Sequence, residues 1–353
     1  MRLSPLTVKK LKRFRSIRRG YWSLVLLSVI FVVTLCGEFL VNNRALFVSY
    51  QGRWHFPALH SGIYTGEDFG LDYKSEARYR DLKAAFESSG AGFVLMPPIP
   101  YGPLEQDYSP GVYPPQPPSF ATGHYLGTDT LARDVLARLF YGFRVAMLFA
   151  LAYIALSFAI GIATGCAMGY FAGRTDLFGQ RVMEIWSCVP FLYLVIILRS
   201  LIPANVGTLG RIGALLAIMS AFSWVSIAYL MRTATYREKA REYVDASRVL
   251  GAGTGRILFK HILPNTISIV VTLIPFMAAG GISALTALDY LGFGLPAPTP
   301  SWGELLQQGT ERMDAPWMVT STFAVLVIVL TLVAFVGEAV REASDPRKFS
   351  TYR

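Results

Sequence analysis

Three glycines between residues 251 and 255 form the segment of this chain most like a phosphate-binding loop. Backbone N–H groups of a glycine-rich turn can bind phosphate oxygens. However, Gly251-Ala-Gly-Thr-Gly255 lacks the Lys-Ser/Thr of a P-loop and breaks the GxGxxG spacing. It also follows a predicted helix rather than a strand. We therefore expect that the chain cannot hydrolyse ATP by itself.

Patterns for metal binding or nucleophilic catalysis have little support. The four histidines lie outside the apolar segments, and the sequence contains no HExxH or CxxC motif. Cys36, Cys166 and Cys188 fall inside apolar segments, where they are expected to act as small packing residues. We predict no catalytic residue and no metal or cofactor bound by this chain.

Two acids, Glu184 and Glu338, lie within apolar segments and could belong to an ion pathway. Both fall near the predicted cytoplasmic ends of their segments, close to Arg181 and Arg341. Salt-bridged helix ends are therefore the favoured interpretation. An ion-coupled secondary transporter or a channel subunit remains the alternative function.

The composition predicts a membrane protein with several spans. Hydrophobic residues make up 53% of the 353, and charged residues only 16%, whereas a soluble domain carries about a quarter charged residues. The net charge is +10, but the basic residues cluster beside apolar segments, which favours contact with the bilayer over nucleic acid. Six segments reach the ~20 residues needed to cross a membrane: 21–41, 143–171, 182–202, 211–231, 266–288 and 318–340.

Basic residues predict the orientation. Residues 1–20 carry Arg2, Lys9, Lys10, Lys12, Arg13, Arg15, Arg18 and Arg19 without an acid, which places this end in the cytoplasm. Counting spans then places the basic 232–264 loop in the cytoplasm as well. The 342–353 tail, with Arg347, Lys348 and Arg353, is also predicted to be cytoplasmic.

The long 42–140 loop is expected outside the membrane as a small subdomain that contacts a partner. Residues 72–88 show helical periodicity, with Ala77, Leu82, Ala85 and Phe86 on one face. Proline clusters at 96–100 and 113–118 favour extended backbone. The stretch 129–140 predicts an amphipathic helix along the membrane surface, capped by Thr128 or Asp129.

Glycines recur every four residues through the second predicted span, at Gly161, Gly165, Gly169 and Gly173. Such a seam lets another helix approach closely. Two interpretations remain open: a moving or subunit interface, and ordinary internal packing.

The 232–264 loop has an ordered pattern of helix signals. Residues 237–250 are strong helix formers, and Gly251 supplies the left-handed residue that often ends a helix. Thr254 can cap a short second helix, which should stop before Pro264. Ala246 and Ser247 leave a shallow surface. The pattern predicts a rigid element that fits a groove on another protein and transmits its movement.

The same residues resemble the EAA loop of ABC-importer permeases. Asp245-Ala246-Ser247, Gly251 and Leu263-Pro264 follow its spacing, with Asp for Glu, Ser for the second Ala and His261 for Ile. This His is usual in the dipeptide/oligopeptide branch. The segments 126–139, 291–296 and 337–347 resemble other signatures of that branch. The long outer loop, together with Ala315-Pro-Trp317, looks most like the second permease of microcin C (Yej-type) peptide importers.

The resemblance implies an all-α polytopic protein with about six transmembrane helices and a type I ABC-importer permease core over 141–341. It would form half of a pathway for peptides or peptide-like compounds, by alternating access, in a bacterial inner membrane. The implied partners are a second homologous permease, two ATPase subunits that use ATP and Mg²⁺, and a periplasmic solute-binding protein.

The resemblance also assigns residues. Those implied to couple to the ATPase are Glu242, Asp245, Ala246, Ser247, Leu250, Gly251, His261, Leu263 and Pro264. Candidates for docking the binding protein are Glu304, Glu311 and Asp314. No internal repeat is found, which weighs against a secondary transporter.

Overall fold

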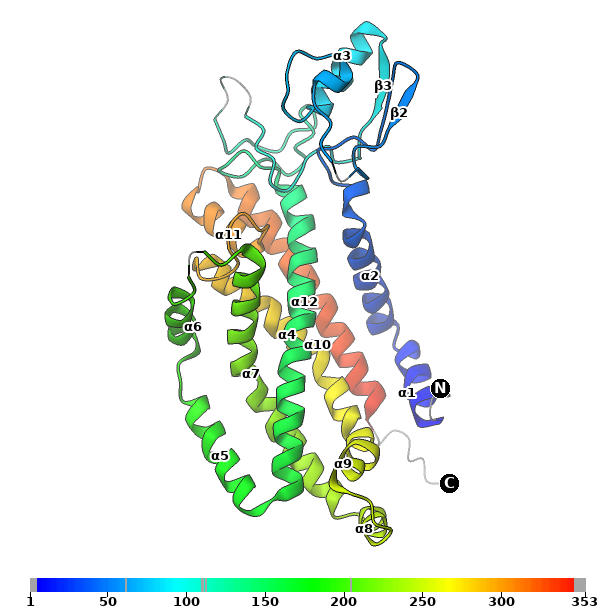
Figure 1. The fold of residues 1–353 in the computed structure, drawn as a ribbon, viewed down its shortest axis with the longest axis vertical. Coiled ribbons are helices and arrows are strands. Elements are labelled where there is room, and N and C mark those ends of the chain that lie inside the picture. Colours follow the sequence, from blue (N-terminus) through cyan, green and yellow to red (C-terminus); the bar gives the residue numbers. More distant parts are fainter. Residues whose placement is uncertain (1–4, 61, 109–110, 112, 204, 346–353) are drawn as a thin grey trace.

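The protein is described by a computed structural model over residues 5–345, except 61, 109, 110, 112 and 204. Arg2, Arg347, Lys348 and Arg353, which entered the orientation argument, lie outside the described residues. The long helices run along the longest axis of the molecule (Figure 1). A small subdomain lies at one end. The other end holds the short helices α8 (Glu242–Val249) and α9 (Thr254–Ile257), with α1 (Pro5–Ser16) and the end of α12 (Pro316–Ser344).

Five helices in the described part of the chain are long and apolar enough to cross a membrane. They are α2 (Arg18–Leu35), α4 (Val135–Phe171), α7 (Thr208–Lys239), α10 (Leu263–Tyr290) and α12 (Pro316–Ser344). The segment expected as one span over 182–202 is instead a bent pair. Here α5 (Gly173–Ser187) and α6 (Phe191–Ser200) meet at 82°. Pro190 directly precedes α6 and supplies no N–H to continue the first helix.

The N-terminal helices α1 (Pro5–Ser16) and α2 pack along α12. A Cβ built on Gly20 would lie 2.1 Å from the Ala339 Cβ, so only glycine allows this approach. Arg19 Nη2 lies 3.1 Å from Glu338 Oε2. The partner of Glu338 is therefore Arg19 rather than Arg341, because α2 packs on this face of α12. The pairing of Arg181 with Glu184 is confirmed, at 2.5 Å.

The subdomain contains a small sheet that the sequence analysis did not predict. Strands β1 (Phe47–Tyr50), β2 (Arg53–His55) and β3 (Gly92–Leu95) are antiparallel in the order β2-β1-β3. Helix α3 (Tyr79–Ser89) covers one face and buries Leu82 and Phe86 against the sheet. The helix begins at Tyr79, later than the expected residue 72. Short 3₁₀ turns at Gly37–Phe39 (η1) and Glu67–Phe69 (η2) complete this part of the chain.

The expected surface helix over 129–140 does not form. Residues 128–134 make a compact turn in which Asp129 Oδ1 accepts from the N–H groups of Leu131 and Arg133. Helix α4 begins at Val135 and is capped by Asp134, whose carboxylate accepts from Ala137 N at 2.7 Å. The apolar side chains Val135 and Leu139 pack against α11 (Trp302–Glu311), so they face protein rather than lipid.

Candidate functional site

The 232–264 loop extends the membrane helices beyond their expected ends. Helix α7 continues to Lys239, and α8 (Glu242–Val249) follows. Gly251 has φ +80°, the left-handed conformation predicted for it. Helix α9 (Thr254–Ile257) begins after Gly253, so Thr254 is its first residue and provides no side-chain cap. The loop is therefore a helix–turn–helix between two spans.

The second helix does not stop before Pro264. It passes through a π-helical turn (η3, Leu258–Ile262) directly into α10, where Pro264 lies in the first turn. Proline lacks an N–H and its ring collides with the carbonyl four residues earlier in an ordinary α-helix. A wider turn with i→i+5 bonding accommodates both restrictions. As a result, α9 is continuous with α10.

The loop is anchored to three spans. Val244, Ile257 and Ile262 are fully buried and pack with Tyr170 near the end of α4. Lys239 Nζ donates to the Tyr170 carbonyl at 2.5 Å. The Tyr243 hydroxyl donates to Glu238 at 2.7 Å and accepts from Asn265 at 2.9 Å, which joins α7, α8 and α10. Movement of this loop must therefore carry the ends of these helices with it.

The outward side of the loop, which we call the tip surface, comprises Asp245, Ala246, Val249, Leu250 and Gly251. All five are exposed, and the side chains of Val249 and Leu250 are each 87% exposed. Adjacent apolar side chains at this exposure are typical of a protein contact. The rigid attachment and the apolar tip fit a lever that binds another protein.

The other sequence-predicted loop residues divide between the surface and the anchor. Glu242 and Pro264 are exposed, whereas His261 and Leu263 are half-buried. The half-buried Ser247 hydroxyl donates to the Tyr243 carbonyl at 2.8 Å. This hydrogen bond lies within α8 itself.

Three of the four seam glycines meet α7. A Cβ on Gly161 would lie 2.6 Å from the Ile227 Cβ, and one on Gly165 would lie 2.5 Å from the Ala228 carbonyl oxygen. Gly169 is equally close to the Arg232 carbonyl. Gly173 lies outside this contact, with φ +53° at the start of α5 and no atom within 4 Å of an added Cβ. The seam joins two helices of the same chain.

An ion pair that sequence reasoning missed ties α5 to the C-terminal part of α7. Both Nε and Nη2 of Arg232 donate to the Asp176 carboxylate, the second at 2.6 Å. Gln180 adds a hydrogen bond of 3.0 Å to the same carboxylate. Because α7 leads directly into α8, this ion pair connects the loop with the bent pair α5–α6.

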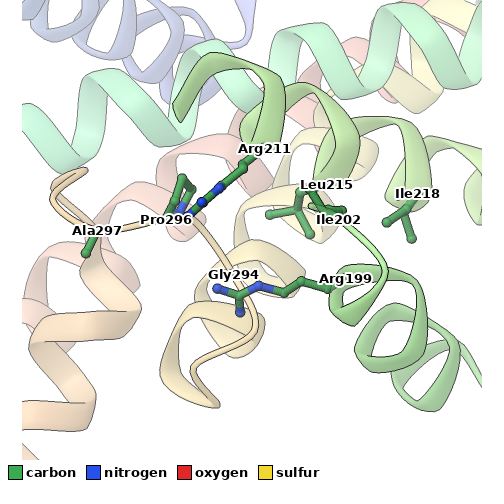
Figure 2. A pocket seen from close by; sticks show the side chains of 8 residues that line it. All are labelled: Arg199, Ile202, Arg211, Leu215, Ile218, Gly294, Pro296 and Ala297. Carbon is green, nitrogen blue, oxygen red and sulfur yellow. The ribbon is translucent and has the colours of Figure 1, made fainter. Parts of the chain in front are cut away.

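Two cavities lie along the α6–α7 side of the molecule. One, of about 280 Å³, is at the break between α5 and α6 and includes Trp186, Phe191 and Ser223. The other, of about 390 Å³, lies between α6, the start of α7 and the segment 294–297 (Figure 2). Irregular backbone at membrane depth is tolerated where it lines a cavity or is buried in protein. This face is the candidate pathway surface.

The three outer acids have different surroundings. Glu304 bonds to Arg133 at 2.8 Å and to the fully buried Arg138 at 2.6 Å, so it holds α11 against α4. Glu311 and Asp314 are exposed. The hydrogen bond from Arg312 holds the pKa of the Asp314 carboxyl below its usual value. Glu304 is thus half-buried within an ion-pair cluster, whereas Glu311 and Asp314 are fully open to a partner.

Comparison with known proteins identifies the family. Residues 157–350 match the family described as "Binding-protein-dependent transport system inner membrane component". The inner membrane ABC transporter permease protein YejE of Escherichia coli (strain K12) is 41% identical, covering 98% of this chain and 99% of that protein.

Two further relatives differ in the transported compound that their names give. The peptidoglycan transport system permease protein YejE of Agrobacterium fabrum is 37% identical, over 98% of this chain and 94% of that protein. The oligopeptide transport system permease protein OppC of Lactococcus lactis subsp. cremoris is 36% identical, covering 64% of this chain and 76% of that protein. The family match and the length of these alignments lead to one conclusion: the chain belongs to the family of binding-protein-dependent transport system inner membrane components.

Proposed function

We propose that this chain is a permease subunit of an ATP-driven importer for peptides or peptide-like compounds of the microcin C type. It forms half of the translocation pathway, and a second homologous permease forms the other half. Similarity to YejE and OppC proteins supports the peptide class. The fold is compatible with alternating access, because packed helices that can adopt two discrete arrangements can open the pathway to either side of the membrane in turn.

The two ends of the molecule support the proposed partners. Two ATPase subunits, which bind ATP and Mg²⁺, dock from the cytoplasm, one of them on the tip surface. A periplasmic solute-binding protein docks at the opposite end, near Glu311 and Asp314. Both chain termini then lie in the cytoplasm of a bacterial cell, with the subdomain outside its inner membrane.

One observation carries this proposal: the tip surface is apolar and exposed, yet it stands on a loop anchored to three spans. Val249 and Leu250 would be unfavourable in water unless a partner covers them. The Arg232–Asp176 pair then connects the tip with the broken span beside the cavities. A domain rotation in the ATPase would reach the pathway surface by this route.

The test is retention of the ATPase. The chain is co-expressed with the proposed ATPases, second permease and binding protein, purified, and reconstituted for ATP-dependent peptide uptake. Leu250→Glu should abolish ATPase co-purification and uptake, because it places a charge in the contact. Leu209→Glu is the matched control, since Leu209 is 85% exposed at the opposite end of α7.

Two results would contradict the proposal. One is peptide uptake by this chain without an ATPase and driven by an ion gradient, which would favour a secondary transporter. The other is full ATPase retention by Leu250→Glu, which would remove the tip surface from the contact.

A further inference from the structure

The outer cavity of about 390 Å³ carries two cations on otherwise apolar walls. Arg199 enters it from the end of α6, and Arg211 from the first turn of α7. Figure 2 shows both side chains reaching toward the segment 294–297, on which Gly294 and Pro296 line the cavity. Leu215 and Ile218 of α7, with Ile202 beyond α6, supply the apolar lining.

Each guanidinium group donates a hydrogen bond to a backbone carbonyl. An Arg199 Nη1 N–H donates to the Gly292 carbonyl, and Arg211 Nε donates to the Val206 carbonyl at 3.0 Å. A guanidinium has five N–H donors in a planar fork, which suits bidentate binding of a carboxylate or phosphate. Because Arg199 is only partly exposed at the end of an apolar helix, an anion beside it interacts more strongly than in water.

The acid close to this region is already engaged. Asp289 is buried on α10, where its carboxylate accepts from Ser301 Oγ and from the Leu295 N–H. A Cβ on Gly294 would lie 1.7 Å from Asp289 Oδ1, so this glycine allows the cavity wall to pass over the carboxylate. Asp289 therefore shapes the wall that faces the two arginines.

We propose that this cavity binds the carboxylate terminus of a peptide substrate, with Arg199 and Arg211 on the carboxylate and Leu215 and Ile218 against the adjoining apolar side chain. The volume lies within the range of small-molecule sites. The cavity adjoins the same α6–α7 face as the cavity at the helix break, so a bound peptide would be at the outer part of the pathway surface. This inference rests on the proposed peptide transport and specifies one contact within it.

The experiment compares two forms of one tripeptide, with a free carboxyl terminus and with a terminal amide, in ATP-dependent uptake by the complete reconstituted transporter. The quantity measured is the ratio of acid to amide uptake, relative to the wild-type ratio. Arg199→Gln should lower this ratio about tenfold, as expected for loss of a hydrogen bond between charged groups. Arg211→Gln should lower the ratio in the same direction. Arg199→Lys should lower it less than Arg199→Gln, because the charge remains but the planar fork is lost.

Arg312→Gln is the matched control, since Arg312 is an exposed arginine that pairs with Asp314 away from this cavity. It should leave the ratio unchanged even if docking of the binding protein is weakened for both peptides. Uptake of the amide shows that each variant is folded. If Arg199→Gln does not fold, Arg199→Lys and Arg211→Gln provide the measurement.

An unchanged ratio in the glutamine variants would overturn the proposal while leaving peptide transport intact. The phosphate of an anionic lipid shares the chemistry of the carboxylate. An unchanged ratio together with loss of co-purified phosphatidylglycerol in Arg199→Gln would therefore assign the cavity to lipid instead. If the wild-type complex takes up neither peptide with ATP, the proposed function itself fails and this inference falls with it.

Discussion

Gly251 determines the direction in which the chain leaves α8. Its φ of +80° is accessible to glycine and costs roughly 1–2 kcal/mol for most other residues. An added Cβ would meet no atom within 4 Å. The requirement for glycine therefore comes from the backbone alone, and the position allows a test of geometry without a change in packing.

We expect Gly251→Val to reduce ATP-dependent uptake several-fold, because the strained turn misplaces Leu250 relative to the ATPase. Gly253→Val is the matched control. Gly253 is also exposed with no atom within 4 Å of a Cβ, but its φ of −70° and ψ of 161° suit any residue. Uptake and ATPase activity are measured in reconstituted transporter. Equal losses in the two variants would show that the left-handed turn is not the cause.

At the scale of elements, contact between α4 and α7 depends on small residues because lipid supplies no hydrophobic force between helices. Gly165→Ala places its Cβ 2.5 Å from the Ala228 carbonyl oxygen, where only movement of the helices can relieve the clash. Overpacking of this kind costs about 1–3 kcal/mol. We expect a lower thermal unfolding midpoint in detergent.

The control for the helix contact is Gly280→Ala on α10, where an added Cβ would meet no atom within 4 Å. The better helix propensity of alanine should leave its unfolding midpoint equal or higher. If Gly165→Ala is as stable as Gly280→Ala, the α4–α7 contact is looser than the structure indicates.

Features set by neighbouring residues could be predicted from the sequence, and those set by distant residues could not. The apolar segments predicted the long helices, and the glycine at position 251 predicted a left-handed residue at the end of a helix. The β1–β3 pairing joins residues 47–50 to 92–95 through four-residue strands, which are too short for a clear alternation. Hydropathy averaged across Pro190 concealed the break. Asp176 with Arg232, and Arg199 with residues 292–297, meet only through tertiary packing.

At the scale of the whole molecule, a chain of charged groups connects the subdomain that contains β1–β3 with the long helices. Arg80 of α3 lies 3.3 Å from Asp107, which lies 3.4 Å from His124. The other ring nitrogen of His124 is 2.9 Å from Asp134, the residue that caps α4. The His124 ring also stacks on Tyr101, at 4.0 Å between centroids. His124 is therefore one link between the two parts of the molecule.

This link should make stability depend on pH. Burial lowers the pKa of His124, but hydrogen bonds to Asp107 and Asp134 outweigh burial and raise it to about 8 from 6.5. The hydrogen bond from His124 also lowers the pKa of Asp107. Since the folded pKa of His124 exceeds the unfolded value, its contribution is complete below pH 6.5 and is lost as the pH rises through about 8. The contribution of Asp107 is lost only at acidic pH.

We expect the thermal unfolding midpoint of the wild-type protein to fall between about pH 6.5 and 8.5, corresponding to roughly 1–2 kcal/mol. His124→Gln removes the titrating group, so its midpoint should be lower at pH 6.5 and nearly constant over the same interval. His60→Gln is the control, because His60 is an exposed histidine of the subdomain and should retain the wild-type slope. A slope that persists in His124→Gln would place the titrating group elsewhere and remove His124 as the pH-dependent connection between the subdomain and α4.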